Sequence, residues 1–258
     1  MLAAIPACGP PPALQLPSGP STPLADAQAV LRDAIGHCAA IHSITAELGL
    51  SGRAGSTKLR GRLQAGFAQP AHVRLEAVAP FGAPYFIVAG TGDHTTLWLP
   101  RDARVLRDTS AADIVEALAG FSATPDDLAA WLEGCPAAAF DGETGQSFGA
   151  QWAQIGGAPR TAWFRKTDRW RLVQTEHEGL AVEFADHVGV QPGRIRIRRA
   201  AAADRAALDV GVSISQVETN VTLGEQAFTV DVSPGAMPIT LDELRRTGPL
   251  RDTSGGTQ

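Results

Sequence analysis

One serine in this chain lies in a pattern that is typical of a catalytic nucleophile. Gly145, Ser147 and Gly149 match the G-x-S-x-G elbow of serine hydrolases, which needs a buried strand before it and a helix after it. Residues 141–144 are polar and loop-like, so we expect a glycine-rich loop and no catalysis. The six histidines are scattered without metal-ligand spacing. The sequence therefore predicts no enzyme, no metal site and no cofactor.

Cysteine chemistry gives a stronger signal, beginning near the N-terminus. Cys8 ends the sequence Ile-Pro-Ala-Cys, which resembles a bacterial lipobox, where the cysteine is acylated and becomes the new N-terminus. Residues 1–7 lack the basic start and long apolar core of a signal peptide, so we expect the natural start to lie upstream. Seven of the 18 prolines lie in the first 23 residues, which predicts an extended tether over residues 1–22. The alternative is an accidental cysteine in an irregular N-terminus.

Two further cysteines, Cys38 and Cys135, remain once Cys8 is set aside. An even pair in an oxidising compartment predicts a disulfide, and the alternative is two separate buried thiols. Metal binding is not expected, because no Cys-x-x-Cys or clustered histidine accompanies them.

Arg194, Arg196 and Arg198 alternate with two isoleucines and give one strand a basic face. We interpret this face as solvated, and the alternative is attraction to anionic lipid headgroups or an acidic partner. The chain carries a formal net charge of −5, which argues against nucleic acid as a partner. No apolar run of 18 residues predicts a membrane-spanning helix.

Alternation of apolar and polar residues dominates most of the chain. A period of two predicts half-buried antiparallel strands, and short turns rich in glycine, serine or proline join them into a meander. The predicted strands are residues 44–51, 58–67, 72–77, 85–89, 95–99, 161–165, 170–174, 181–185, 194–198 and 208–217.

The apolar spacing becomes helical in four places. Thr22 and Pro23 are typical of an N-cap and a first helical position, and they predict a helix ending near Ala40 with Cys38 on its buried face. Three more short helices are predicted by capping-box pairs, which are Ser110 with Asp113, Thr124 with Asp127, and Thr240 with Glu243.

These elements predict one mainly β domain with some α structure over residues 23–248. The simplest architecture is a curved, incomplete antiparallel sheet of about ten or eleven strands, with helices covering its apolar concave face. Such a face is the apolar, concave kind of site that suits a lipid ligand. We expect residues 249–258 to be disordered.

The loop of residues 80–84, Pro-Phe-Gly-Ala-Pro, lies between two predicted strands. Its prolines restrict the backbone conformation of the loop, and its glycine allows backbone angles that other residues rarely adopt. The Phe81 side chain at such a tip either packs into the protein itself or is presented to something apolar outside the protein. We expect Phe81 to be exposed.

Three segments carry a resemblance to a known family. They are residues 73–82, which end in Pro-Phe-Gly, residues 97–102, which read Leu-Trp-Leu-Pro-Arg-Asp, and residues 124–134, which contain Leu-x-x-Trp-Leu-x-Gly. Together with Cys8 and the helix before the first strand, they resemble the LolB family of outer-membrane lipoproteins, and more broadly the LolA/LolB-like fold. The family pattern is a strand ending in Pro-Leu-Gly and a later helix of the Leu-x-x-Trp-Leu-x-Gly kind.

The resemblance covers roughly residues 24–232 and implies a half-open antiparallel β-barrel with a helical lid. It implies a monomer, lipid-anchored in the outer membrane and facing the periplasm. Its cavity would receive the acyl chains of lipoproteins from a LolA-like periplasmic carrier and help to insert them in the outer membrane. The residues expected to line the cavity and lid are Leu48, Leu50, Leu63, Leu75, Leu97, Leu128, Trp131 and Leu132.

The resemblance also implies a role for the loop at Pro80, Phe81 and Gly82. In the family the apolar residue between proline and glycine is implicated in delivering lipoproteins to the membrane. An aromatic residue suits the membrane interface, so we expect Phe81 to contact outer-membrane lipid. The alternative function is an envelope structural or tethering lipoprotein that binds a protein partner with the same half-barrel.

Overall fold

The structure is a computed structural model that describes residues 14–137, 139–140, 142–203 and 205–247. The predicted lipidation site Cys8 and the predicted disordered tail at residues 249–258 lie outside the described residues. The part of the predicted tether that is described before β1, residues 14–21, contains no helix or strand.

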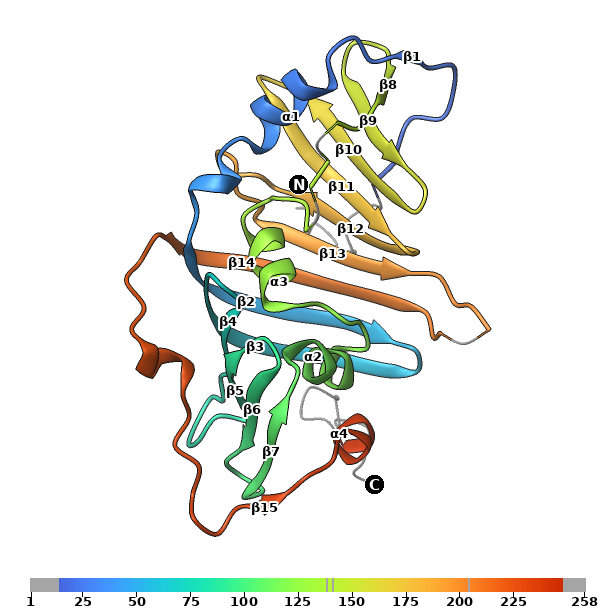
Figure 1. Ribbon diagram of the computed structural model, residues 1–258. Coiled ribbons are helices and arrows are strands. Elements are labelled where there is room, and N and C mark those ends of the chain that lie inside the picture. Colours follow the sequence, from blue (N-terminus) through green and yellow to red (C-terminus); the bar gives the residue numbers. More distant parts are fainter. Residues whose placement is uncertain (1–13, 138, 141, 204, 248–258) are drawn as a thin grey trace, which may run out of the picture.

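Fifteen strands in the described part of the chain form one hydrogen-bonded sheet (Figure 1). All neighbours are antiparallel except β15 and β7, which are parallel. The two end strands, β1 and β15, do not pair with each other, so the sheet is open. In spatial order the strands are β1 (Thr22–Pro23), β8 (Gly145–Phe148), β9 (Trp152–Gly157), β10 (Arg160–Lys166), β11 (Trp170–His177), β12 (Leu180–Ala185), β13 (Arg194–Arg199), β14 (Leu208–Thr219), β2 (Ser43–Ala54), β3 (Thr57–Ala68), β4 (His72–Ala77), β5 (Ile87–Thr91), β6 (His94–Leu99), β7 (Arg104–Thr109) and β15 (Met237–Pro238).

The predicted mainly β, open antiparallel sheet is confirmed, but the expected ten or eleven strands are too few. The additional strands are β1, β7, β8, β9 and β15. Strands β1 and β15 have two residues each, too short for any periodicity. Strand β7 ends in polar residues, and β8 and β9 each contain glycine, which weakens a strand signal. These strands form because a neighbouring strand supplies hydrogen-bond partners.

The longest ladder in the sheet is the β2–β3 hairpin, which pairs from Ser43 with Ala68 to Ala54 with Thr57. In this register Leu48 lies opposite Leu63. Because side chains alternate between faces, one face of the hairpin is apolar and the other carries polar groups. The apolar face is concave and holds the core.

Two helices cover the concave face near its centre (Figure 1). Helix α2 (Ala111–Ala119) packs over β5 and β6, and helix α3 (Pro125–Leu132) packs over β3 and β4. Both predicted N-caps are confirmed, because the Ser110 hydroxyl accepts from Asp113 N at 3.1 Å and the Thr124 hydroxyl accepts from Asp127 N at 3.1 Å. Residues with capping-box spacing thus start both lid helices.

The first helix differs from its prediction. Helix α1 is Ala27–Ile35, its N-cap is Asp26, and a separate 3-10 turn, η1, covers Cys38–Ala40. The expected cap residues Thr22 and Pro23 instead form β1, because Leu24 N donates to Gly145 O and draws this segment onto the sheet. Tertiary hydrogen bonds here override the local helix signal.

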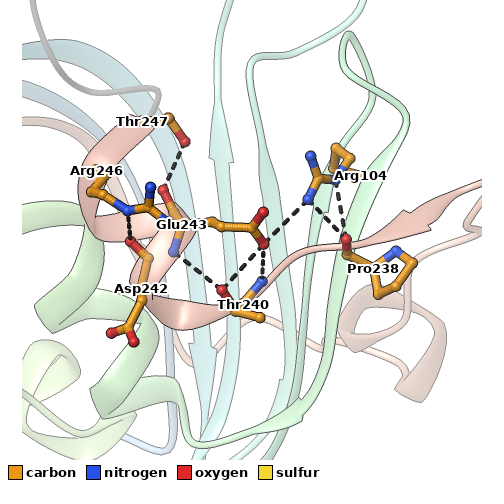
Figure 2. A network of polar contacts seen from close by, with 7 residues as sticks. All are labelled: Arg104, Pro238, Thr240, Asp242, Glu243, Arg246 and Thr247. Atoms are coloured by element: carbon orange, nitrogen blue, oxygen red, sulfur yellow. Dashed lines mark hydrogen bonds and ion pairs between the residues drawn. The ribbon is translucent and has the colours of Figure 1, made fainter.

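The C-terminal segment crosses the outside of the sheet before its last helix. It includes the 3-10 turn η2 (Glu225–Phe228) and ends in helix α4 (Leu241–Thr247) beside α2. Figure 2 shows the confirmed cap of α4, in which the Thr240 hydroxyl accepts from Glu243 N and the Glu243 carboxylate accepts from Thr240 N. Arg104 donates to the same carboxylate and to Pro238 O, which fixes α4 to β7.

The predicted disulfide is present between Cys38 and Cys135. It joins the 3-10 turn after α1 to Cys135, the third residue after the end of α3. The bond therefore clips the N-terminal segment to one of the two helices on the concave face.

We expect Cys38→Ser with Cys135→Ser to lower the free energy of unfolding by about 2–5 kcal/mol, because the bond closes a loop of 97 residues and restricts the unfolded chain. Urea denaturation measures the change. Thiol reductant should destabilise the wild type and leave the double variant unchanged. A double variant as stable as the oxidised wild type would contradict the prediction.

Candidate functional site

An apolar cavity of about 90 Å³ lies between the concave face and helices α2 and α3. Every side chain that lines it is hydrocarbon or aromatic, and none is charged. Seven of the eight predicted lining residues are among them, namely Leu48, Leu50, Leu63, Leu75, Leu128, Trp131 and Leu132.

Leu97 does not line this cavity, which corrects one expectation. It lies on β6 and is fully buried in the core. Helix α2 packs over β6 and closes off the surface on which Leu97 lies. The alternating pattern identified the inward face correctly but could not place α2 along the sheet.

Sequence reasoning missed the rest of the lining, which comes from both halves of the sheet. Ile195 and Ile197 on β13 face the cavity, whereas the prediction from the sequence concerned only the arginines beside them. Their alternation with arginine was the signal that could have found them. The other additions are Phe67, Phe86, Val115, Leu118, Ala119, Phe121 and Val212.

The size of the cavity constrains what it can hold. Ligand sites are typically about 300–1,000 Å³, and this cavity is about 90 Å³. Trp131 fills part of the space, with its side chain buried and its ring centroid 6.1 Å from that of Phe121. A long apolar ligand fits only when a covering helix moves outward.

Helix α3 is fixed at both ends. At its start, Asp126 accepts from Ala71 N at 3.1 Å, which ties the helix to the turn before β4. At its end, Gly134 has a φ of 71°, and an added Cβ there would meet Val190 O at 2.9 Å, so glycine is required. The disulfide follows at the next residue. Any outward movement of α3 would therefore have to hinge at these two tied ends.

A buried acid lies beside this hinge and was not predicted. Glu133 is 7% exposed, and burial raises the pKa of its carboxyl to about 7. His37 Nε2 lies 3.1 Å from the Glu133 carbonyl oxygen and within 3.9 Å of both disulfide sulfurs. These sulfurs are bonded to each other, so they are not the thiolates that a metal needs.

The loop of residues 80–84 presents Phe81, as the sequence predicted. Phe81 is 89% exposed, and neighbouring Gly82 has a φ of 77°, which glycine adopts without strain. Arg101 from the β6–β7 turn donates to Phe81 O at 3.1 Å and Ala83 O at 3.0 Å, and its guanidinium lies 4.1 Å from the Tyr85 ring centroid. Arg101 thus holds the tip of the loop, and backbone bonds from Val78 N to Arg62 O and from Tyr85 N to Ala77 O hold its ends.

Ser147 lies within strand β8, so the expected glycine-rich loop is wrong. Its hydroxyl lies 2.8 Å from the Thr22 hydroxyl of β1, and a turn leading to β9 follows in place of a helix. The strand-turn-helix geometry of a nucleophile elbow does not occur here.

The basic face of β13 is neutralised by carboxylates from neighbouring segments. Arg194 pairs with Asp186 and Arg198 pairs with Glu183. The bidentate pair of Arg196 with Asp209, at 2.7 Å, lowers the pKa of that aspartate. This pairing accounts for the stripe of arginines without an external partner.

Each helix in the described residues is too short or too polar to span a bilayer.

No family model and no curated protein matches the chain. Among solved structures, it is similar to a LolA superfamily protein from Nitrosomonas europaea, with a TM-score of 0.45, 11% identity, and coverage of 80% of this chain and 99% of that one. A DUF1329 family protein from Desulfovibrio piger ATCC 29098 has a TM-score of 0.42 and 14% identity, with coverage of 73% of this chain and 90% of that one. A putative outer membrane lipoprotein-sorting protein domain from Vibrio parahaemolyticus has a TM-score of 0.40 and 11% identity, with coverage of 72% of this chain and 89% of that one. TM-scores below 0.5 do not establish a shared family, so the function is argued below from the cavity and the loop.

Glu133 predicts a pH dependence of stability. In the folded protein the Glu133 carboxyl keeps its proton up to about pH 7, whereas its ordinary pKa is 4.5. Between these two pH values the folded state therefore binds more protons than the unfolded state. Stability therefore falls as the pH rises through this window. Above pH 7, ionisation of Glu133 lowers the free energy of unfolding by up to about 3 kcal/mol, and we expect Glu133→Gln to restore this amount. Below pH 4.5 the substitution should have little effect on the free energy of unfolding. Urea denaturation at both ends of the window measures the difference, and an equal difference at both ends would count against it.

Proposed function

We propose that this protein binds the acyl chains of lipoproteins in the cavity under α2 and α3 and helps to insert them in the outer membrane. The observation that carries the proposal is the wholly apolar lining of the cavity, built by an open sheet and two short helices. Each buried CH₂ group contributes about 0.8 kcal/mol. Burial of an acyl chain can therefore offset the outward movement of a helix.

The role proposed is non-catalytic. The cavity offers no nucleophile, acid or base among its lining residues. The protein would act as a monomer, anchored through Cys8 and facing the periplasm, and would take its cargo from a LolA-like periplasmic carrier. The anchor follows from the lipobox-like sequence that ends at Cys8, and the carrier follows from the family resemblance described above.

The loop at Phe81 supports the second half of this role. An exposed aromatic ring at a restrained loop tip is suited to enter the interfacial region of a bilayer. Phe81 would then contact outer-membrane lipid while the cavity still holds the cargo. The acyl chain would then pass from an apolar cavity into an apolar membrane.

The alternative function is supported by the small cavity volume. A tethering lipoprotein with a permanently filled concave face would bind a protein partner and no lipid. Association with a membrane protein, together with no affinity for acyl chains, would favour this alternative.

The acyl-binding function is tested with a fluorescent fatty acid and an acylated peptide. We expect both to bind the wild type, and Val115→Trp to weaken binding about tenfold because the larger side chain fills the cavity. Val188→Trp is the matched control, because Val188 is 80% exposed. Circular dichroism checks that both variants fold. No binding by the wild type would overturn the proposal.

The loop is tested by following transfer of an acylated lipoprotein from the purified protein to vesicles. We expect Phe81→Glu to slow transfer by about tenfold or more, because a charged side chain cannot enter the bilayer interface as an aromatic ring does. Its fatty-acid affinity should be unchanged. Val188→Glu, a matched change at another exposed apolar position, should transfer normally. Normal transfer by Phe81→Glu would remove the loop from the mechanism.

A further inference from the structure

Exposed apolar side chains gather near one loop. Five large hydrophobic residues are exposed in the described part of the chain, and three of them, Val78, Phe81 and Tyr85, lie within eight residues of sequence. A cluster of this kind commonly marks an interaction surface. Its charged neighbours indicate what it contacts.

Strand β3 places two arginines beside this loop. The last pair between β3 and β4 is Leu63 with Ala77, and β3 continues from there to Thr57 without β4 at its side. Val78 N donates to Arg62 O at 2.8 Å, so the start of the loop follows this free part of β3. Because side chains alternate, Arg60 and Arg62 both lie on the outer face, opposite the buried Leu63.

These two arginines retain most of their positive charge toward solvent. Arg60 is exposed and makes no ion pair with a carboxylate of the described residues. Arg62 is 81% exposed in its side chain, and it reaches Glu47 only at 3.8 Å. An exposed pair at that distance is weak in water.

Arg101 adds a third positive charge on the other side of the loop. Its bonds to Phe81 O and Ala83 O use carbonyl groups, which do not neutralise it. The guanidinium also covers the ring of Tyr85. Arg101 thus both holds the loop and contributes charge at its base.

The arrangement is not a consequence of overall composition. The chain has a net charge of −5, and the most arginine-rich strand, β13, has Arg194, Arg196 and Arg198 paired with carboxylates. Arg60 and Arg62, which are only weakly paired or unpaired with carboxylates of the described residues, lie beside the exposed apolar cluster. Charge and apolar exposure therefore coincide at one place on the surface.

We propose that Val78, Phe81 and Tyr85, flanked by Arg60, Arg62 and Arg101, form a docking surface for an anionic membrane. This rests on the proposed function and specifies the lipid surface to which the cargo is delivered. Phe81 projects from a loop tip, so it can enter the bilayer interface while the arginines remain at the level of the phosphate groups. Each basic residue near an anionic surface strengthens binding about fivefold.

The experiment uses the full chain with Cys8→Ser, so that acylation cannot anchor it. Co-sedimentation is measured with vesicles of phosphatidylcholine alone and of phosphatidylcholine mixed with phosphatidylglycerol. We expect preference for the mixed vesicles, lost at high salt, and a reduction of about twentyfold in Arg60→Gln with Arg62→Gln. Arg165→Gln with Lys166→Gln removes the same charge from exposed positions on β10 and should bind as the parent does.

Arg101 is tested by a reporter for the depth of the loop. In the background Phe81→Trp, quenching by brominated lipid reports insertion of the ring. Arg101→Lys keeps the charge but loses the fork that holds Phe81 O and Ala83 O. We expect similar total binding but weaker quenching, an outcome that charge alone would not produce.

Two results would overturn the proposal. One is equal binding to both kinds of vesicle, and the other is an equal loss in the β10 control. Capture of an acidic protein in place of anionic vesicles would assign the surface to a protein partner and also overturn it. Fatty-acid binding by the same variants should be unchanged. A failure of fatty-acid binding in the parent would instead refute the cavity function and leave the membrane result standing.

Discussion

The structure depends on the antiparallel ladder between β14 and β2. These strands pair from Leu208 with Ala54 to Thr219 with Ile44, and they join strands β8–β13 to strands β3–β7. The cavity has walls from both sides of this ladder, with Ile195 on one side and Leu63 on the other. Without the pairing there would be two smaller sheets and no shared concave face. A contact between residues far apart in sequence thus creates the candidate site.

The covering of that face is made of elements that are weak alone. Helices of eight or nine residues are marginal in water, so α2 and α3 depend on their packing against the sheet. The disulfide at Cys135 and the cap at Thr124 hold the ends of α3, while its middle is held only by apolar contacts. Rigid ends with a weakly held centre would suit the movable cover that the proposed function requires. A large sheet with a permanent, thick layer of helices would not combine these properties.

Much of this arrangement could be predicted from the sequence, because alternation and capping are local. The inward faces of the long strands and the starts of three helices follow from spacing alone. The two-residue strands, the position of Leu97 and the strand at Ser147 could not be predicted, because each depends on which distant segment lies alongside. The buried acid Glu133 was hidden for the same reason. An isolated glutamate reads as a surface residue until the chain around it is placed.

The two shortest strands have a consequence for the tendency of the protein to aggregate. An open sheet exposes unpaired N–H and C=O groups at both edges, where another chain could add a strand and begin aggregation. Strand β1 covers one edge along β8, and β15 covers the other along β7. Both end after two residues, and each contains a proline, Pro23 or Pro238, which has no N–H to offer. The sheet can therefore stay open while resisting the addition of foreign strands.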